Sequence, residues 1–339
     1  FRIADLAGGL TALRILGAIG AAATVWLLAS TTGRVFGHRA AGWTAVVAAG
    51  LLISPLVGSA PVDGEMLAPP FLALGLRLAV EAVYSEDPHA ARGPALGTGL
   101  AAVLALLVKQ NMADVVVFAV VCWAVAWRTR RITGRTLRDL LALAVVGGAV
   151  GYAVVMLWAM AHGTSPLGVY EATYPFRVRA GSVIAATPGN ASQLRLGRLG
   201  FSALLSAGPL ILVAFLAVAL RRTRQPAVVW GLVAAGTYAC ASILAGGSYW
   251  LHYLVQGIPV VALAAGAISV RMAPVVRVLV PAGVLPAGGG RRGPVAAPPP
   301  RPRPPVRPAG VSPAPPCAHP PPPCHGMGTP RAAWGGSPR

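Results

Sequence analysis

The chain has 339 residues, of which 55% are hydrophobic and only 11% charged, and its mean hydropathy is +0.67. Soluble globular domains carry about a quarter charged residues, so the composition excludes an ordinary soluble domain. The formal net charge is +19, but the basic residues fall in short turns and in a Pro-rich tail, which argues against a nucleic-acid partner. We therefore expect a protein whose solvent is the lipid bilayer.

Apolar stretches follow one another along most of the chain. Crossing the roughly 30 Å hydrocarbon layer takes about 20 apolar residues in a helix, because each backbone polar group must find its partner within the segment. The sequence predicts an all-α fold, a polytopic bundle of about nine to ten transmembrane helices, with an incomplete tenth span near residue 274. The nine predicted spans are 10–30, 42–59, 66–84, 95–109, 112–127, 140–162, 199–220, 226–246 and 251–270.

Basic residues predict the orientation of the bundle, because they are retained on the cytoplasmic side. The turns that hold 13 arginines, and that we expect in the cytoplasm, are 31–41, 85–94, 128–139, 221–225 and 271–277. Loops 60–65 and 247–250 have no basic residue and should face outward. Segment 163–198, also outward, is too long to be mere connection, and a structureless loop of that length usually serves as a lid or binding segment.

The two ends of the chain predict different things. The chain begins with Phe1 and enters a hydrophobic segment almost at once. We therefore expect this sequence to be a fragment that lacks the N-terminal part of the protein. The transmembrane domain should comprise residues 1–285. In residues 286–339, 18 of 54 positions are proline, which predicts a disordered low-complexity tail. A shifted reading frame explains this tail most economically, because it cuts into a further apolar span. Prolines fill the spacing of its Cys and His residues, so we expect no metal site and no cofactor.

An acidic turn follows the second predicted span. Asp63 and Glu65 flank Gly64 on a short outward connection, where two carboxylates can bind a cation, orient a sugar hydroxyl or act as a base. The alternative is a solvated turn whose acidic residues lie near a helix N-terminus, where the helix dipole favours them.

A second group of candidates is cationic. Lys109, Gln110 and Asn111 lie at the outward end of the fourth predicted span. An ammonium beside amide groups is a good phosphate site, which Arg177 and Arg179 would complete. The alternatives are a lysine that snorkels to the interface and a basic loop that touches anionic headgroups.

His252 and Tyr253 open the last complete span on the same side, after Trp250, which we interpret as an interface aromatic. Together with the acidic and cationic groups they give the mixture of acids, bases and donors that a polar-substrate enzyme needs. Arg14 lies about a turn into the first span, where a charge indicates function by default. Arg77 and Glu81, at i and i+4, should form a structural pair.

Several short motifs resemble a known family. They are Leu13-Arg14-Ile15-Leu16, Ser54-Pro55, the acidic turn with Asp63 and Glu65, Leu106-Leu107-Val108-Lys109-Gln110, and the run from His252-Tyr253 to Ile258-Pro259. Over roughly residues 1–272 the chain resembles the C-type membrane glycosyltransferases. Within them it is most similar to the protein O-mannosyltransferase and lipid A aminoarabinose transferase type.

The resemblance implies inverting transfer of a sugar from a polyprenyl-phosphate donor to a glycan, lipid or protein acceptor at the outer face of a bacterial plasma membrane. Asp63 and Glu65 match the family's second acidic motif, Lys109 matches a phosphate-holding position, and His252-Tyr253 match the outer start of a late helix. The first helix and first outer loop, where the family carries its principal catalytic aspartate, are not in this sequence, which implies impaired activity.

Two other functions stay open. A secondary transporter of a small polar solute should show inverted repeats and broken helices; no repeat is evident, but Gly147-Gly148 and Gly246-Gly247 are positions where helices can break. A non-catalytic membrane scaffold that keeps the fold without the chemistry is the third possibility.

Overall fold

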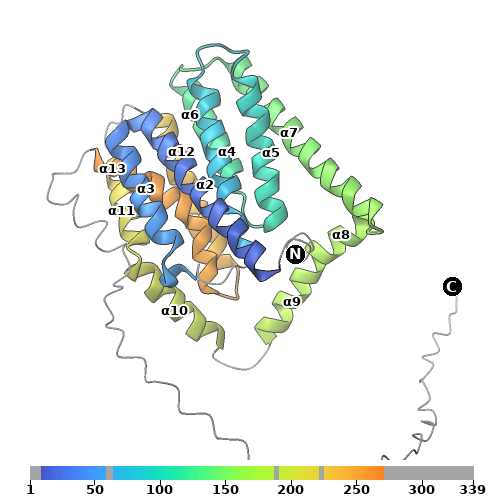
Figure 1. The fold of residues 1–339 in the computed structure, drawn as a ribbon. Helices are drawn as coiled ribbons and strands as arrows, with labels where there is room; N and C mark the ends of the chain where they lie inside the picture. Colours follow the sequence, from blue (N-terminus) through green and yellow to red (C-terminus); the bar gives the residue numbers. More distant parts are fainter. Residues whose placement is uncertain (1–8, 59–63, 187–190, 221–224, 271–339) are drawn as a thin grey trace, which may run out of the picture. The chain divides into compact units, whose positions relative to one another are not determined.

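The computed structural model describes residues 9–58, 64–186, 191–220 and 225–270, and these ranges contain helices and no strands (Figure 1). In chain order the α-helices are α2 (Leu10–Phe36), α3 (His38–Leu52), α4 (Pro69–Tyr84), α5 (Arg92–Val108), α6 (Asp114–Arg128), α7 (Gly134–Ala161), α8 (Pro166–Thr173), α9 (Pro175–Ala186), α10 (Ala191–Leu205), α11 (Gly208–Ala219), α12 (Pro226–Ala245) and α13 (Ile258–Ser269). Three 3-10 segments accompany them: η1 (Pro55–Val57), η2 (Gly64–Leu67) and η3 (Leu251–Gly257).

Five described segments are long and apolar enough to cross a membrane: Leu10–Phe36, Glu65–Tyr84, Gly134–Ala161, Pro226–Ala245 and Leu251–Ser269. The pair α10 and α11, bent by 60°, would make a sixth. Helices α3 and α6 have 15 residues and α5 has 17, or about 22–26 Å at 1.5 Å per residue, short of the hydrocarbon layer. The all-helical membrane fold is confirmed, whereas the count of nine to ten spans stays a prediction. The tenth span and the tail 286–339 lie outside the described residues.

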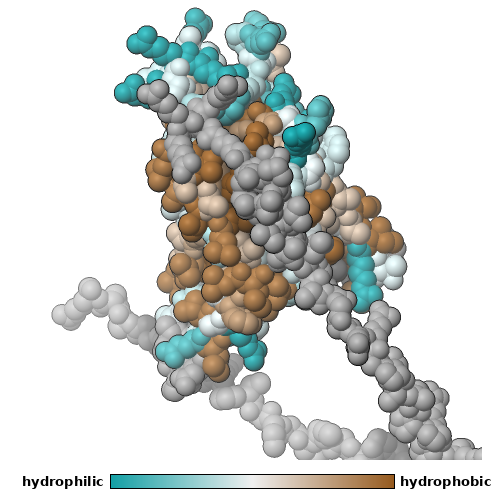
Figure 2. All heavy atoms as spheres, turned by 90° about the vertical axis from the view of Figure 1, so that its left-hand side faces the viewer, coloured by the Kyte–Doolittle hydropathy of each residue, from teal (hydrophilic) through white to brown (hydrophobic). Residues whose placement is uncertain are grey.

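The outer surface of the bundle is apolar where a bilayer would touch it. On α7, Val145 and Leu157 are 70% and 65% exposed, and Trp158 is exposed beside them. Exposed arginines, among them Arg128 and Arg135, gather in the turn where α6 ends and α7 begins. On the face drawn in Figure 2, apolar side chains form a band between polar groups at the upper and lower ends. Such a surface is stable only in lipid, so the chain is a membrane protein.

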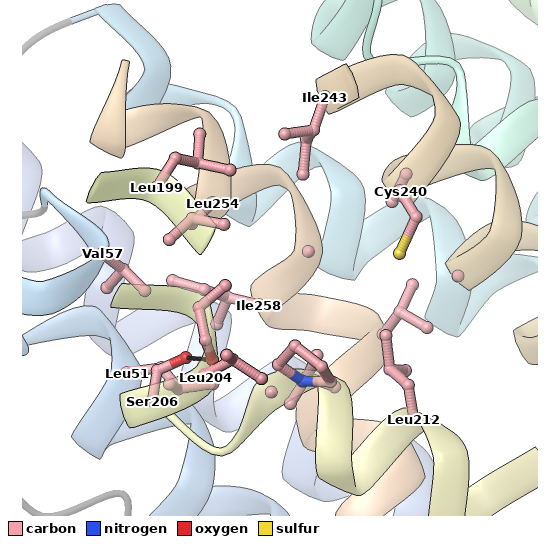
Figure 3. Close-up of a pocket in the computed structure, with 18 of the residues that line it drawn as sticks. Leu51, Val57, Leu199, Leu204, Ser206, Leu212, Cys240, Ile243, Leu254 and Ile258 are labelled. Atoms are coloured by element: carbon pink, nitrogen blue, oxygen red, sulfur yellow. Dashed lines mark hydrogen bonds between the residues drawn. The ribbon is translucent and has the colours of Figure 1, made fainter. Parts of the chain in front are cut away.

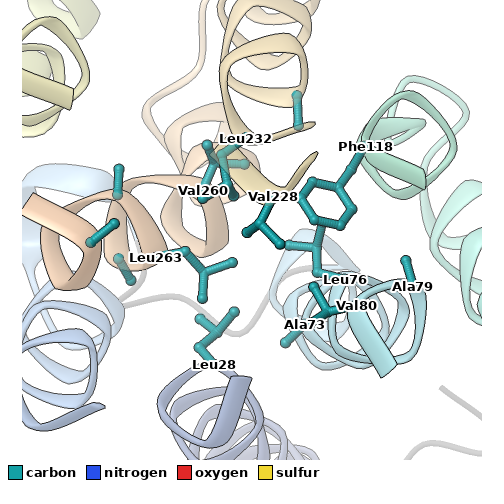
Figure 4. Packing of buried hydrophobic residues seen from close by; sticks show 14 of the residues in the cluster. Leu28, Ala73, Leu76, Ala79, Val80, Phe118, Val228, Leu232, Val260 and Leu263 are labelled. Atoms are coloured by element: carbon teal, nitrogen blue, oxygen red, sulfur yellow. The ribbon is translucent and has the colours of Figure 1, made fainter. Parts of the chain in front are cut away.

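The core lies where five helices meet (Figure 4). Leu28 of α2, Leu76 of α4, Phe118 of α6, Leu232 of α12 and Leu263 of α13 are all buried in one apolar cluster. These helices come from both halves of the described chain, so the core joins the segments that carry the candidate site residues.

Glycines bring α5 and α7 into close contact. A Cβ on Gly99 would lie 1.7 Å from the Ala144 carbonyl oxygen, and one on Gly147 would lie 2.0 Å from that of Leu96. Only residues without a side chain allow two helices to approach so closely. Helix α7 is continuous from Gly134 to Ala161 and includes Gly147-Gly148, so the suggestion that this pair breaks a helix was wrong. The two glycines serve the close packing of α7 instead. At Gly246-Gly247 the chain does leave the helix, because α12 ends at Ala245 and Gly247 has φ +68°.

Segment 163–198 is not the structureless loop that its length suggested. It holds α8 and α9, and α10 begins at Ala191. The Ser165 hydroxyl accepts a hydrogen bond of 3.0 Å from the Gly168 N–H and so caps α8, and proline begins both α8 and α9, where its missing N–H is harmless. Figure 1 shows α8, α9 and α10 along one end of the bundle.

At the opposite end, Arg77 and Glu81 form the expected pair. Arg77 Nε lies 2.9 Å from Glu81 Oε1, the Arg77 guanidinium also contacts Ser30, and Arg34 lies 3.5 Å from the same carboxylate oxygen. These contacts tie α2 to α4, which supports the structural interpretation of the pair.

Candidate functional site

Three charged or titratable side chains from distant segments meet at one end of the bundle. Lys109 Nζ donates a hydrogen bond of 2.7 Å to Glu65 Oε1, and His252 Nε2 lies 3.4 Å from the same oxygen. The Lys109 and Glu65 side chains are only 11% and 18% exposed. Segment η2, the end of α5 and the start of η3 therefore lie on one side of the bundle.

The local backbone explains why these side chains reach one another. Helix α5 ends at Val108, and Lys109 turns into an extended conformation with φ −155° and ψ 125°, which aims its side chain away from the helix. The η1 turn ends in Gly58, which has φ +67° and lies against the backbone of His252. A Cβ on Gly58 would lie 2.7 Å from the His252 backbone nitrogen. Glycine thus serves twice here, for its left-handed conformation and for the close approach of η3.

Aromatic rings surround the cluster. Lys109 Nζ lies 3.6 Å from the centre of the Tyr253 ring, a cation–π contact. The His252 ring meets the Tyr253 ring edge-on at 5.2 Å and stacks with Trp250 at 6.2 Å. The Arg195 guanidinium lies 4.6 Å from the Trp250 ring centre, so α10 contacts the start of η3.

A cavity of about 520 Å³ lies beside Lys109. Its wall is formed by the turn between α5 and α6, by α8 and α9, by α12 and its end, and by η3. The lining residues are Lys109, Gln110, Asn111, Thr173, Tyr174, Val178, Tyr238, Ala241, Ser242, Ala245, Gly246 and Tyr253. The volume is in the range of small-ligand sites. Segment 163–198, expected to be a binding segment, contributes three of these residues.

A polar network anchors the turn that carries Lys109. The Asn111 carbonyl oxygen accepts hydrogen bonds from the Tyr238 hydroxyl (2.8 Å), the Gln256 amide (3.2 Å) and the Ser242 hydroxyl (3.3 Å). The Asn111 side-chain amide donates to Ser242 Oγ at 2.8 Å and to Gln256 Oε1 at 3.0 Å. Gln256 also donates to Asp114 Oδ2 at 2.9 Å. Helix α12 and segment η3 thus hold the turn between α5 and α6 in place.

A second cavity, of about 340 Å³ and almost wholly apolar, adjoins another face of α12 (Figure 3). Leu199 and Leu204 of α10, Leu212 of α11, and Cys240 and Ile243 of α12 line it. On α12 the residues that line the apolar cavity alternate with those that line the polar one. One helix therefore separates a space suited to hydrocarbon from a space suited to polar groups.

The structure brings some of the predicted site residues together and not others. Glu65, Lys109, His252 and Tyr253 form the cluster, and Gln110 lines the cavity with Lys109.

The remaining candidates lie elsewhere or outside the description. Asp63 falls outside the described residues, and so do Cys317 and Cys324, the tail cysteines at which we expect no metal site. Arg177 lies on α9, but its side chain is not among those described. Arg179 is exposed on α9, and Arg14 is exposed on α2.

Sequence reasoning passed over the network behind the cavity. Tyr238 and Ser242 stand at i and i+4 in an otherwise apolar span, which places both on one helix face. Gln256, four residues after His252, is 1% exposed. A polar side chain at a regular spacing inside an apolar span is the signal that identifies such residues.

Comparisons with known proteins bear on the fold. No family model matches the sequence, and no curated protein matches it significantly. Among solved structures, the fold is similar to ArnT from Cupriavidus metallidurans, crystallised with undecaprenyl phosphate bound, with a TM-score of 0.58 and 20% sequence identity. The match covers 80% of this chain and 49% of that one, so the chain spans about half the length of ArnT. The likeness shows the fold alone, an ArnT-like helical membrane fold.

Proposed function

We propose that this chain binds a polyprenyl-phosphate-linked sugar at the outer face of a bacterial plasma membrane and serves the inverting transfer of that sugar to an acceptor. The observation that carries the proposal is the Lys109 ammonium at the wall of a polar cavity of about 520 Å³. The likeness to ArnT, which was crystallised with undecaprenyl phosphate, supports the choice of ligand. The aminoarabinose transferase or O-mannosyltransferase type remains the finer form of the proposal.

In this proposal Lys109 binds the lipid phosphate. The ammonium of Lys109 donates through its N–H groups, and in this proposal the phosphate oxygens accept from it. Gln110 lines the same cavity and offers amide donors. Arg177 and Arg179 are the proposed further cations, because Tyr174 and Val178 on the same stretch of chain line the cavity.

The chemistry that these groups serve is a substitution at the anomeric carbon. An acceptor oxygen forms a bond to that carbon while the bond from the carbon to the phosphate oxygen breaks, and the phosphate leaves with the electron pair. Cations at the phosphate stabilise the charge that develops on the leaving group. The acceptor's proton passes to a carboxylate, for which the chain offers Glu65 and, outside the described residues, Asp63.

The hydrocarbon part of the ligand has its own proposed place. The apolar cavity beside α12 (Figure 3) is lined by leucine, isoleucine and valine side chains, which suit a prenyl chain. The phosphate would then lie at the polar cavity while isoprene units contact the other face of α12.

Binding of undecaprenyl phosphate to the purified chain in nanodiscs tests the proposal. Lys109→Met should weaken binding about 10- to 100-fold, the effect of losing charge-assisted hydrogen bonds. Arg135→Gln, an exposed cation in the turn before α7, is the matched control and should bind normally. Equal binding by wild type and Lys109→Met, or none by either, contradicts the proposal. Release of labelled sugar to added acceptors then separates a transferase from a scaffold, which binds the lipid without transferring the sugar.

One observation favours the transporter alternative. Helices α10 and α11 form a pair broken by 60°, and broken helices are typical of secondary transporters. The polar groups, however, gather at one end of the bundle, whereas a transporter places its binding site near the membrane midplane. Uptake of a labelled polar solute into proteoliposomes free of lipid-linked sugar would support the transporter and count against the transferase.

A further inference from the structure

The polar cavity has a chemical character that phosphate binding does not explain. Lys109 and Gln110 offer donors to an anion at one part of the wall. Asn111, Tyr238 and Ser242, which line the cavity as well, belong instead to a network rich in acceptor oxygens. A single anionic group would use the first set, and the second set would then serve only to anchor the turn that carries Lys109.

Two oxygens of this network are buried without a hydrogen-bond donor among the described residues. They are Asn111 Oδ1 and Asp114 Oδ1. The orientation of the Asn111 side-chain amide is fixed by its nitrogen, which donates hydrogen bonds to Ser242 Oγ and Gln256 Oε1. Asp114 is only 1% exposed. The Gln256 amide donates a hydrogen bond to Asp114 Oδ2 and not to Oδ1.

These two acceptors need donors that the described residues do not supply. Buried polar atoms in native proteins nearly always have partners, and an exception calls for an explanation such as a ligand. The anchoring of the Lys109 turn is already achieved by the three donors to the Asn111 carbonyl. The unsatisfied oxygens add nothing to that anchoring and are unfavourable without a donor.

We infer that the network formed by Asn111, Asp114, Tyr238, Ser242 and Gln256 is the subsite for the transferred sugar, with its acceptor oxygens matched to the sugar's hydroxyl groups. This inference rests on the proposed function, because it assigns the second half of the same cavity. Asn111, Tyr238 and Ser242 line the cavity and contact the sugar, with Asn111 Oδ1 as an acceptor for one of its hydroxyl groups. Gln256 and Asp114 do not line the cavity and act as positioning residues behind them. Sites built to hydrogen-bond a substrate's hydroxyls reject analogues that lack them.

The test compares lipids that differ only in the sugar. Undecaprenyl phosphate without sugar, with mannose and with an amino pentose is titrated against the full chain in nanodiscs. The wild type should bind at least one sugar-bearing lipid about tenfold more tightly than the bare lipid, the effect of one to two hydrogen bonds. Tyr238→Phe combined with Ser242→Ala should weaken binding of the sugar-bearing lipid by a larger factor than binding of the bare lipid, which also falls because the same two hydroxyls hold the turn that carries Lys109. Thr237→Val, an exposed position on the same helix, should change neither.

A second, isosteric variant guards against misfolding. Asp114→Asn keeps an acceptor for Gln256 and replaces the unsatisfied oxygen with an N–H group, so it should lower the sugar preference without loss of thermal stability. Asp139→Asn, an exposed carboxylate on α7, is its matched control. Loss of affinity for bare and sugar-bearing lipids by the same factor, or a sugar preference that survives both variants, overturns the inference. If the wild type binds the bare lipid without any sugar preference, the sugar subsite fails but the phosphate site stands; if it binds no lipid, the proposed function fails with it.

Discussion

The pair of Lys109 and Glu65 yields a prediction that depends on geometry alone. Lys109→Met and Glu65→Gln each remove one charge while keeping most of the side-chain volume. Removing one partner of a buried pair costs about 3–5 kcal/mol, because the other charge is left uncompensated. With side chains 11% and 18% exposed, water still reaches the survivor, so we expect about 2–3 kcal/mol for each single variant.

The neighbours of the pair refine this estimate. After Lys109→Met, the His252 ring remains beside the carboxylate, with Nε2 at 3.4 Å from Glu65 Oε1. After Glu65→Gln, the ammonium keeps its position 3.6 Å from the Tyr253 ring centre. Neither neighbour replaces a hydrogen bond of 2.7 Å. The double variant should therefore be more stable than the sum of the two losses predicts, with a coupling energy of about 2 kcal/mol.

The assay is reversible unfolding in mixed micelles, measured for the wild type, both single variants and the double variant. The exposed pair of Arg138 and Asp139, with side chains 75% and 51% exposed, supplies the control cycle and should show coupling of about 0–0.5 kcal/mol. A coupling energy near zero for Lys109 and Glu65 would refute the claim that they form a partly buried pair.

Two glycine predictions follow from the same structure. Gly147→Ala should destabilise the chain by about 2 kcal/mol or more through overpacking, because the new Cβ would enter the α5 backbone. Gly200→Ala, at a helical position with open space around it, should be neutral or slightly stabilising. Equal effects of the two substitutions in thermal unfolding would contradict the close contact between α5 and α7. Gly58→Ala should weaken undecaprenyl phosphate binding as well as stability, because it displaces the backbone of His252. Gly37→Ala shares the positive φ but has no neighbour within 4 Å, so it should lower stability by about 1 kcal/mol and leave binding unchanged.

The sequence predicted the helical membrane fold because apolar run length is a direct consequence of bilayer thickness. It was less informative about helix ends. The predicted span 199–220 is two helices, with Ala207 at φ +57° between them. The pair Gly208-Pro209 at the start of α11 was the sequence signal of this break, which the length of the apolar run concealed. Segment 163–198 was expected to lack structure because its mixed polarity shows no apolar run. Its short helices α8 and α9 begin at prolines, which the length and polarity of the segment did not indicate.

The candidate site divides in the same way. Loop charge asymmetry placed Glu65, Lys109 and His252 on one side of the membrane, and the structure brings these three side chains together. The roles assigned to them stay predictions. The sequence offered Asn111 as an amide beside Lys109, but not its network with Tyr238, Ser242 and Gln256, because that network consists of contacts between the α5–α6 turn, α12 and η3 that depend on how the helices pack. Sequence periodicity predicts which face of a helix is polar, but not which other polar face it meets.

Thiol labelling at the polar cavity tests the central claim most directly. In a variant without the four native cysteines, Thr173→Cys places a thiol in the cavity wall and Arg135→Cys places one in the turn before α7. We predict that a membrane-impermeant maleimide labels the first thiol in intact cells and that undecaprenyl phosphate protects it in nanodiscs. The second should react only after permeabilisation and without protection. Labelling of both thiols from the same side, or labelling of the cavity thiol that the lipid does not slow, would contradict an outward site for a lipid phosphate.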